Sequence, residues 1–304
     1  MKNLLPLMLR EWLQHRFAWA LLVLVPVALS LVLLSVGTIQ LDDEMAAMGP
    51  RDLSLMVAVV SMMITATVVL MLLGTTSLFI ALGSPRRDHG DRSVEFWLSL
   101  PSGHAESLLA PMLVHLLLVP AAALVIGYAA ALPISLMAVG RVTGVGEWFA
   151  LPWLQILPGL GALLLRALAG LPLALLWLLP LVLAAMMANA LFRRWGLPVL
   201  GVGLILLAQG LERLFGQPVL VDVLGALLLN AATSLAGAAG QALSVEKGSV
   251  PLESLSALPG WALGDLGAAY AKLAQPLMVG VLLVSAGLFA ALVAWRRRGA
   301  SVGG

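Results

Sequence analysis

The chain has 304 residues, of which 61% are hydrophobic and 11% are charged, and its formal net charge is +2. So little polar surface cannot cover a soluble globule of this size, so the composition excludes an ordinary soluble domain and predicts a polytopic membrane protein. The chain has no cysteine, which excludes disulfides, thiolate metal sites and cysteine nucleophiles.

Residues 1–16 predict an interfacial helix. Leu5, Leu9 and Trp12 share one helical face, so this segment is expected to lie in the headgroup plane, the alternative being a frayed start to the first span. Residues 17–39 follow as an uninterrupted apolar run of spanning length. Its apolar core is longer than that of a signal peptide, which favours an uncleaved anchor.

Five further apolar runs predict an all-α protein with six transmembrane helices. The second run, residues 53–83, is longer than one crossing requires, so it must tilt or project beyond the hydrocarbon. The other four predicted spans cover residues 108–139, 167–192, 197–215 and 275–295.

A polar stripe follows the second predicted span, where Ser54, Ser61, Thr65 and Thr76 fall within a narrow arc of the helix. These hydroxyls are candidates to line a substrate pathway. We favour the alternative, in which small hydroxyls bond their own backbone carbonyls and let helices pack closely.

The third predicted span contains three prolines and a histidine. Pro111, Pro120 and Pro133 are expected to kink this helix and free backbone carbonyls. His115 lies in its first turns, and we interpret it as a packing or interfacial residue because no acidic partner accompanies it in the sequence.

Two stretches are too polar to read as simple spans. Residues 140–166 carry two tryptophans and predict a helix on the outer interface. Residues 216–274 predict outer re-entrant helices, because a seventh crossing there would place the triplet Arg296-Arg297-Arg298 outside. With the N-terminus inside, the inner loops hold 11 of the 17 basic residues but five of the 15 acidic ones, as the positive-inside rule requires.

No catalytic or nucleotide-binding motif is present. The sequence lacks a P-loop, a dinucleotide fingerprint and a His-Glu-x-x-His motif, and its predicted spans carry no ladder of ionisable residues for ion coupling. An intramembrane hydrolase is disfavoured because no acid, base and nucleophile set is evident. We therefore expect no enzymatic activity, cofactor, metal or nucleic acid, and we expect any transport to be driven from outside the chain.

The loop of residues 84–107 contains a short amphipathic segment, Asp91 to Pro101, between two long apolar runs. As a helix, this segment places its charged side chains on one side and Val94, Trp97 and Leu98 on another. Among the segments expected on the cytoplasmic side, it is the one best suited to be bound and moved by a partner protein.

The order Asp91-Arg92-Ser93, Phe96-Trp97, Ser99-Leu100-Pro101-Ser102 resembles the coupling loop of permease subunits of the type-2 (ABC-2) exporter family of ABC transporters. The plan of an interfacial helix, six spans and outer re-entrant helices is similar to that family too. The chain departs from the family at Ser102-Gly103-His104 and Ala110-Pro111, which leaves the subfamily and the substrate open.

The resemblance implies a multi-pass protein of the bacterial cytoplasmic (inner) membrane with both termini in the cytoplasm. It implies a separate ATP-binding cassette ATPase, which binds ATP and Mg, and a second permease that is either another copy or a related chain. The lipid bilayer is the remaining partner. The expected docking residues are Asp91, Arg92, Ser93, Glu95, Phe96, Trp97, Leu100 and Pro101.

The expected function is ATP-driven export of a hydrophobic or amphiphilic substrate. One alternative is a membrane scaffold that holds an ATPase for envelope assembly or signalling without transport. For Phe96 and Trp97, the alternative to docking is anchoring of an interfacial helix in the headgroups.

Overall fold

The computed structural model describes residues 4–41, 43–90, 103–237 and 252–301, and these form helices joined by short connections. The helices are α1 (Leu4–Val36), α2 (Asp43–Ala46), α3 (Pro50–Gly90), α5 (His104–Leu113), the π-helix η1 (Val114–Leu118), α6 (Val119–Val142), α7 (Val145–Ala150), α8 (Trp153–Phe192), the 3-10 helix η2 (Arg193–Trp195), α9 (Gly196–Phe215), α10 (Val219–Ala236), α12 (Leu252–Ala271), the 3-10 helix η3 (Lys272–Ala274) and α13 (Pro276–Ser301).

Six helical stretches are long and apolar enough to cross a membrane, which confirms the all-α membrane class. Four of these stretches each overlap one predicted run, and the other two differ from the prediction. The predicted spans 167–192 and 197–215 fall within one stretch, Trp153–Phe215, and Val219–Ala236, part of the predicted re-entrant region, is itself of spanning length. The other four are Leu4–Val36, Pro50–Pro85, His104–Val142 and Pro276–Arg297.

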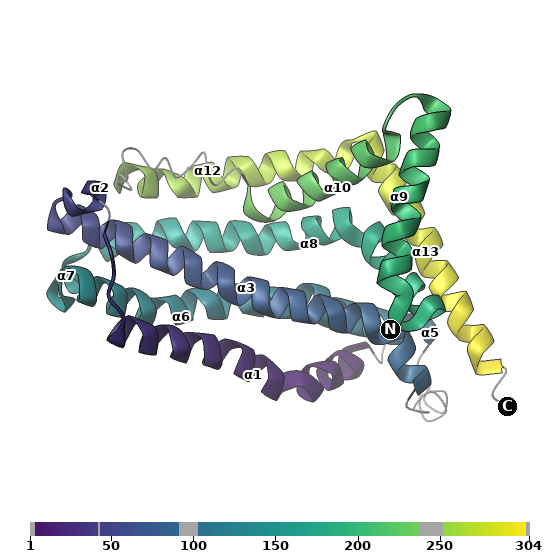
Figure 1. Cartoon of the computed structure of the whole chain (residues 1–304), viewed down its shortest axis with the longest axis horizontal. Helices are drawn as coiled ribbons and strands as arrows, with labels where there is room; N and C mark the ends of the chain where they lie inside the picture. Colours follow the sequence, from purple (N-terminus) through teal and green to yellow (C-terminus); the bar gives the residue numbers. More distant parts are fainter. Residues whose placement is uncertain (1–3, 42, 91–102, 238–251, 302–304) are drawn as a thin grey trace.

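The centre of the fold is a bundle of long helices (Figure 1). α3 packs along α6, and α8 packs against α3 on one side and against α10 and α12 on the other. Small residues permit the closest approach of α3 and α6, where a Cβ added to Gly127 would lie 3.0 Å from the Cα of Ala66. The 41 residues of α3 and the 40 of α8 give lengths of about 60 Å, twice the hydrocarbon thickness. These helices must therefore tilt or project, as expected for residues 53–83.

α1 is continuous from Leu4 to Val36, so residues 4–16 are part of a longer helix and not a separate interfacial one. It flanks α6 and α5. Pro26 lies within it, and α1 is visibly bent in Figure 1.

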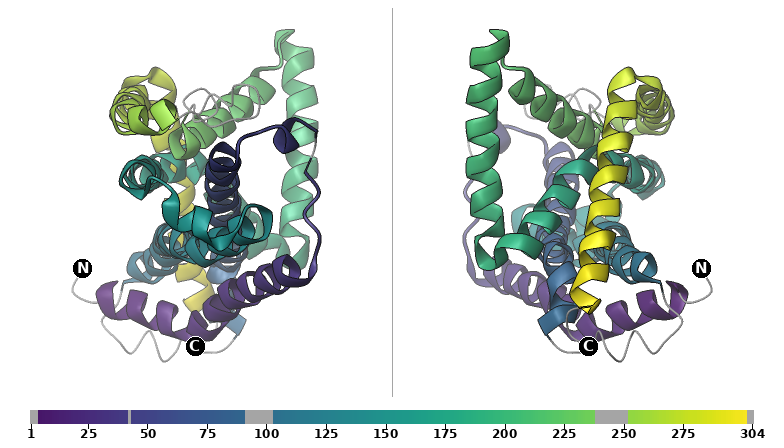
Figure 2. Two further views of the ribbon diagram at one scale, coloured as in Figure 1. Left: turned by 90° about the vertical axis from the view of Figure 1, so that its left-hand side faces the viewer. Right: turned by 90° about the vertical axis from the view of Figure 1, so that its right-hand side faces the viewer.

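α9 runs across the direction of α3 and α8 in both Figure 1 and Figure 2. The chain turns at η2, where Arg193 has a φ of 58° and Gly196 packs against Asn189. A side chain at Gly196 would collide with the backbone of Asn189, since an added Cβ would lie 2.6 Å from its Cα. The short break between the predicted spans 167–192 and 197–215 therefore redirects the chain sharply.

One end of the bundle collects the start of α1, the end of α3, the start of α5, η2 and the end of α13 (right-hand side of Figure 1). The opposite end holds the connections from α1 to α3 and from α6 to α8. The predicted coupling segment, Asp91 to Pro101, lies outside the described residues, and the helices on either side of it meet at the first of these ends.

Candidate functional site

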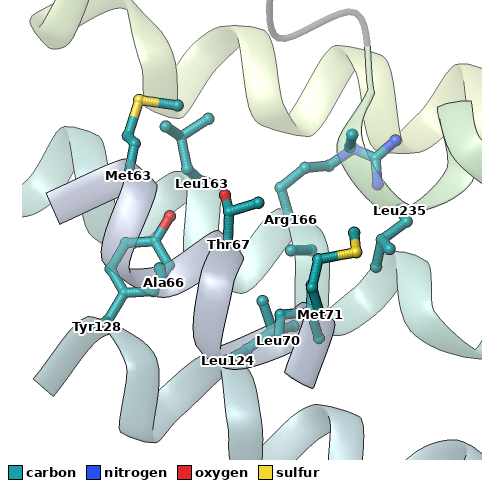
Figure 3. A pocket seen from close by; sticks show the side chains of 12 residues that line it. Met63, Ala66, Thr67, Leu70, Met71, Leu124, Tyr128, Leu163, Arg166 and Leu235 are labelled. Carbon is teal, nitrogen blue, oxygen red and sulfur yellow. The ribbon is translucent and has the colours of Figure 1, made fainter. Parts of the chain in front are cut away.

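Two adjoining cavities lie between α3, the η1–α6 helix and α8. Their volumes are about 210 and 380 Å³, and both are lined by Leu70, Met71 and Leu235. The smaller reaches Tyr128 and Arg166, and the larger reaches Gly74 and His115. Figure 3 shows the smaller cavity, with Tyr128 on one side and Arg166 beside Leu235 on the other.

The cavity walls are mostly apolar. Hydroxyl groups come from Thr67 and Tyr128 in the smaller cavity and from Thr75 in the larger. Apolar walls with a few polar groups suit an apolar or amphiphilic ligand, because a strongly hydrated solute would lose its water without compensation.

Three of the four hydroxyls of the predicted polar stripe bond a backbone carbonyl three or four residues earlier. Ser61 donates to the carbonyl of Ala58 at 3.0 Å, and Thr65 donates to that of Ser61 at 2.7 Å. Ser54 is fully buried, 2.6 Å from the carbonyl of Pro50 and 2.6 Å from the hydroxyl of Thr143. The threonines lining the two cavities are Thr67 and Thr75, so pathway lining by Ser54, Ser61, Thr65 and Thr76 stays a prediction.

Arg166 marks one end of the cavities and is only 3% exposed. Its Nε donates to Oδ2 of Asp265 at 2.7 Å, and its NH2 lies 2.6 Å from the same oxygen. NH1 donates to the carbonyl of Ser234 at 2.7 Å, and NH2 donates to that of Thr233 at 3.1 Å. One guanidinium thus joins α8, α10 and α12.

The C-terminal end of α10 suits this cation. The last carbonyls of a helix carry partial negative charge, and those of Thr233 and Ser234 accept from Arg166, that of Thr233 in addition to the backbone N–H of Gly237. The ammonium of Lys272 donates to the hydroxyl of Thr233 at 3.2 Å, which adds a second cation. Because the charge of Arg166 is matched by Asp265 and these carbonyls, the cavity wall carries no uncompensated charge at this point.

Glycine brings α8 and α10 together beside Arg166. A Cβ added to Gly170 would overlap the carbonyl oxygen of Ser234 and lie 2.6 Å from NH1 of Arg166. Gly170 lies one helical turn after Arg166, on the same face of α8. Its missing side chain therefore provides the space in which the guanidinium meets α10.

The other end of the cavities is built on η1, which lies between Pro111 and Pro120. The backbone N–H of Val119 donates to the carbonyl of Val114, five residues back. Prolines lack the donor that would complete ordinary α-helical bonds, and π-turns are frequent at functional sites. The predicted proline distortion of this helix takes the form of a π-turn that carries His115.

His115 is fully buried, and its acidic partner comes from a distant part of the sequence. Its Nε2 lies 3.4 Å from Oε2 of Glu11, which is 4% exposed. His15 meets His115 edge to face, with ring centroids 5.4 Å apart, and Trp19 packs on both rings. Glu11 is 104 residues from His115, so sequence proximity could not reveal this cluster.

Arg166 and Asp265 were not singled out in the sequence either. Arg166 stood at the border of a predicted outer interface, whereas α8 continues through it from Trp153. The signal that could have found it is an arginine within a long apolar run, because an ionisable residue at membrane depth needs a partner.

Comparisons with protein-family models, curated proteins and solved structures find no match for this chain.

Proposed function

We propose that this chain is the membrane-spanning permease subunit of an ATP-driven exporter of the type-2 ABC family. It moves a hydrophobic or amphiphilic substrate when a separate ATPase subunit, holding ATP and Mg, grips the segment Asp91 to Pro101. Two permeases, either copies of this chain or this chain and a relative, complete the transporter in a bacterial inner membrane.

The observation that carries the proposal is the pair of adjoining apolar cavities between α3, the η1–α6 helix and α8. An exporter must hold its substrate between helices that can separate, and two helices of this wall, α3 and α5–η1–α6, are the ones that flank the proposed docking segment. A force applied to that segment would act directly on both.

The charges of the described residues support the proposed orientation. The end of the bundle where α3 ends and α5 begins also holds the exposed Arg193, Arg194 and Arg297. Basic residues favour the cytoplasmic face, where an ATPase would dock. This arrangement supports cytoplasmic termini, because α1 starts and α13 ends on the same side.

Filling the larger cavity is expected to block transport. Gly74 lines it, and a Cβ added there has nothing within 4 Å, so Gly74→Phe can enter the cavity without moving the backbone. ATP-dependent movement of a fluorescent short-chain phospholipid, measured in inverted vesicles, should fall at least about tenfold, the effect of losing about 1.4 kcal/mol of substrate binding.

The matched control is Gly83→Phe on the same helix. Gly83 is exposed and also has open space around its Cβ position. This variant should transport at the wild-type rate. Equal loss of transport in both variants would show that a phenylalanine in α3 is harmful wherever it is placed, and would count against substrate passage through the cavity.

Removing two aromatic side chains from the docking segment is expected to release the ATPase. Phe96→Ala with Trp97→Ala should weaken co-purification of the ATPase at least about 30-fold, since one buried aromatic anchor contributes about 2 kcal/mol. The control pair is Phe192→Ala with Trp195→Ala, two exposed aromatics at the same end of the bundle. Full ATPase binding by the first double variant would favour headgroup anchoring instead.

Both measurements together separate an exporter from a scaffold. A scaffold would lose its ATPase in the Phe96/Trp97 variant, yet Gly74→Phe would leave its activity unchanged because no substrate enters the cavity. ATP-dependent lipid movement that Gly74→Phe abolishes while ATPase binding is retained would support export.

A further inference from the structure

Glu11, His15 and His115 converge beside the larger cavity, and their ligand atoms all lie within 4.8 Å of one another. We propose that these three side chains bind one divalent transition-metal ion, with zinc as the best fit. The inference is independent of the transport proposal, because it rests on coordination geometry and burial alone.

The three residues supply ligands from two separate elements. Glu11 and His15 are four residues apart on α1 and so share one face of that helix, while His115 comes from η1. Two imidazoles and a carboxylate form a common zinc ligand set, with a fourth position left for water. The sequence offers no metal motif because His115 is 104 residues from Glu11.

One of the distances between ligand atoms closely matches that of a zinc site. Oε2 of Glu11 and Nε2 of His115 are 3.4 Å apart, and ligands with bonds of about 2.0–2.1 Å in a tetrahedral zinc site are separated by about 3.3 Å. The third ligand lies within 4.8 Å of the other two. Closing the remaining gap requires His15, the least buried of the three, to turn its ring toward the ion.

The burial of Glu11 and His115 is the second argument for a bound metal ion. Glu11 is 4% exposed and His115 is fully buried, and a carboxylate removed from water costs several kcal/mol unless a charge compensates it. A divalent ion at this point would compensate the buried carboxylate and bind both imidazoles.

Charges around the site bear on its affinity. NH2 of Arg10 lies 3.8 Å from Oε1 of Glu11, but the arginine side chain is 34% exposed and can move into solvent. Arg16 stacks over the ring of Phe17, 4.8 Å from its centroid. Trp19 packs against both imidazole rings, with its ring centroid 5.9 Å from each.

The test uses the full-length chain in detergent, purified with a tag that contains no histidine and dialysed against a chelator. Zinc titrated against a chromogenic chelator should show one tight equivalent per chain, and cobalt should give the visible d–d bands of a low-symmetry site. Glu11→Gln, His15→Ala and His115→Ala should each lower zinc affinity at least about tenfold. His104→Ala, which removes a histidine at the start of α5, should leave the equivalent intact.

Thermal unfolding keeps the test decisive where a variant folds poorly. Zinc should raise the Tm of the wild-type chain, and magnesium at the same concentration should not, because a ligand bound to the folded state stabilises it. Binding of zinc by Glu11→Gln and His15→Ala as tightly as by wild type would overturn the proposal. So would the absence of both a tight equivalent and a zinc-dependent rise in the wild-type Tm.

Discussion

Arg166→Met is expected to lower the free energy of unfolding by about 3–5 kcal/mol, the usual cost of breaking a buried ion pair. The substitution keeps an apolar stem but leaves the Asp265 carboxylate, whose side chain is 20% exposed, beside the negative end of α10. It also removes the donors to the carbonyls of Ser234 and Thr233. The Asp265 carboxylate and the carbonyl of Ser234 would then lose the guanidinium in the same place, while the carbonyl of Thr233 keeps the backbone N–H of Gly237.

The double variant Arg166→Met with Asp265→Leu identifies the cause. It removes the stranded carboxylate, so it should recover a large part of the lost stability, since a buried pair replaced by apolar residues is often tolerated. Unfolding in SDS, followed by tryptophan fluorescence, gives the stability of the wild type, of Arg166→Met and of the double variant. Arg213→Met, at an exposed site on α9, is the control and should stay within about 0.5 kcal/mol of wild type. If Arg166→Met were as stable as Arg213→Met, Arg166 would not be the residue that links α8 to α10 and α12.

The membrane class could be predicted from sequence because it depends on local composition. Runs of about 20 apolar residues identify spanning helices whatever surrounds them. The helix distortion could be predicted from Pro111 and Pro120 because it also depends on local sequence: a proline alters the backbone wherever it lies in a helix. The π-turn between them, and the histidine it carries, needed the structure.

The polar clusters could not be predicted because their members are far apart in the chain. Asp265 is 99 residues from Arg166, and Glu11 is 104 from His115. Neither charge pattern nor helical periodicity says which helices are neighbours. The same limit applies to Arg166: this residue ended the stretch predicted as an interface helix, whereas partners from two other helices, α10 and α12, hold it inside a continuous α8.

The region predicted as re-entrant illustrates a third limit. Residues 216–274 looked too polar to cross the membrane, yet α10 and α12 both pack along α8. Two charged residues of this region, Asp265 and Lys272, interact with Arg166 of α8 and with Thr233 at the end of α10. The docking segment remains a prediction from residue order alone, because it lies outside the described residues.

Gly170→Ala is expected to cost about 3 kcal/mol of unfolding free energy, the upper part of the range for overpacked cores. The added methyl group would overlap the carbonyl oxygen of Ser234, which belongs to the backbone and cannot rotate away. It would also press on NH1 of Arg166. α10 must then move off α8, and the guanidinium must lose its carbonyl partners.

The control is Gly161→Ala on the same helix, where an added Cβ has nothing within 4 Å. Alanine favours a helix over glycine by up to about 1 kcal/mol, so this variant should be neutral or slightly more stable, the opposite sign from Gly170→Ala. Combining Gly170→Ala with Arg166→Met should cost less than the sum of the two, because either change alone already frees α10 from α8. Strict additivity in SDS unfolding would mean that the glycine contact and the arginine hydrogen bonds stabilise the α8–α10 crossing independently.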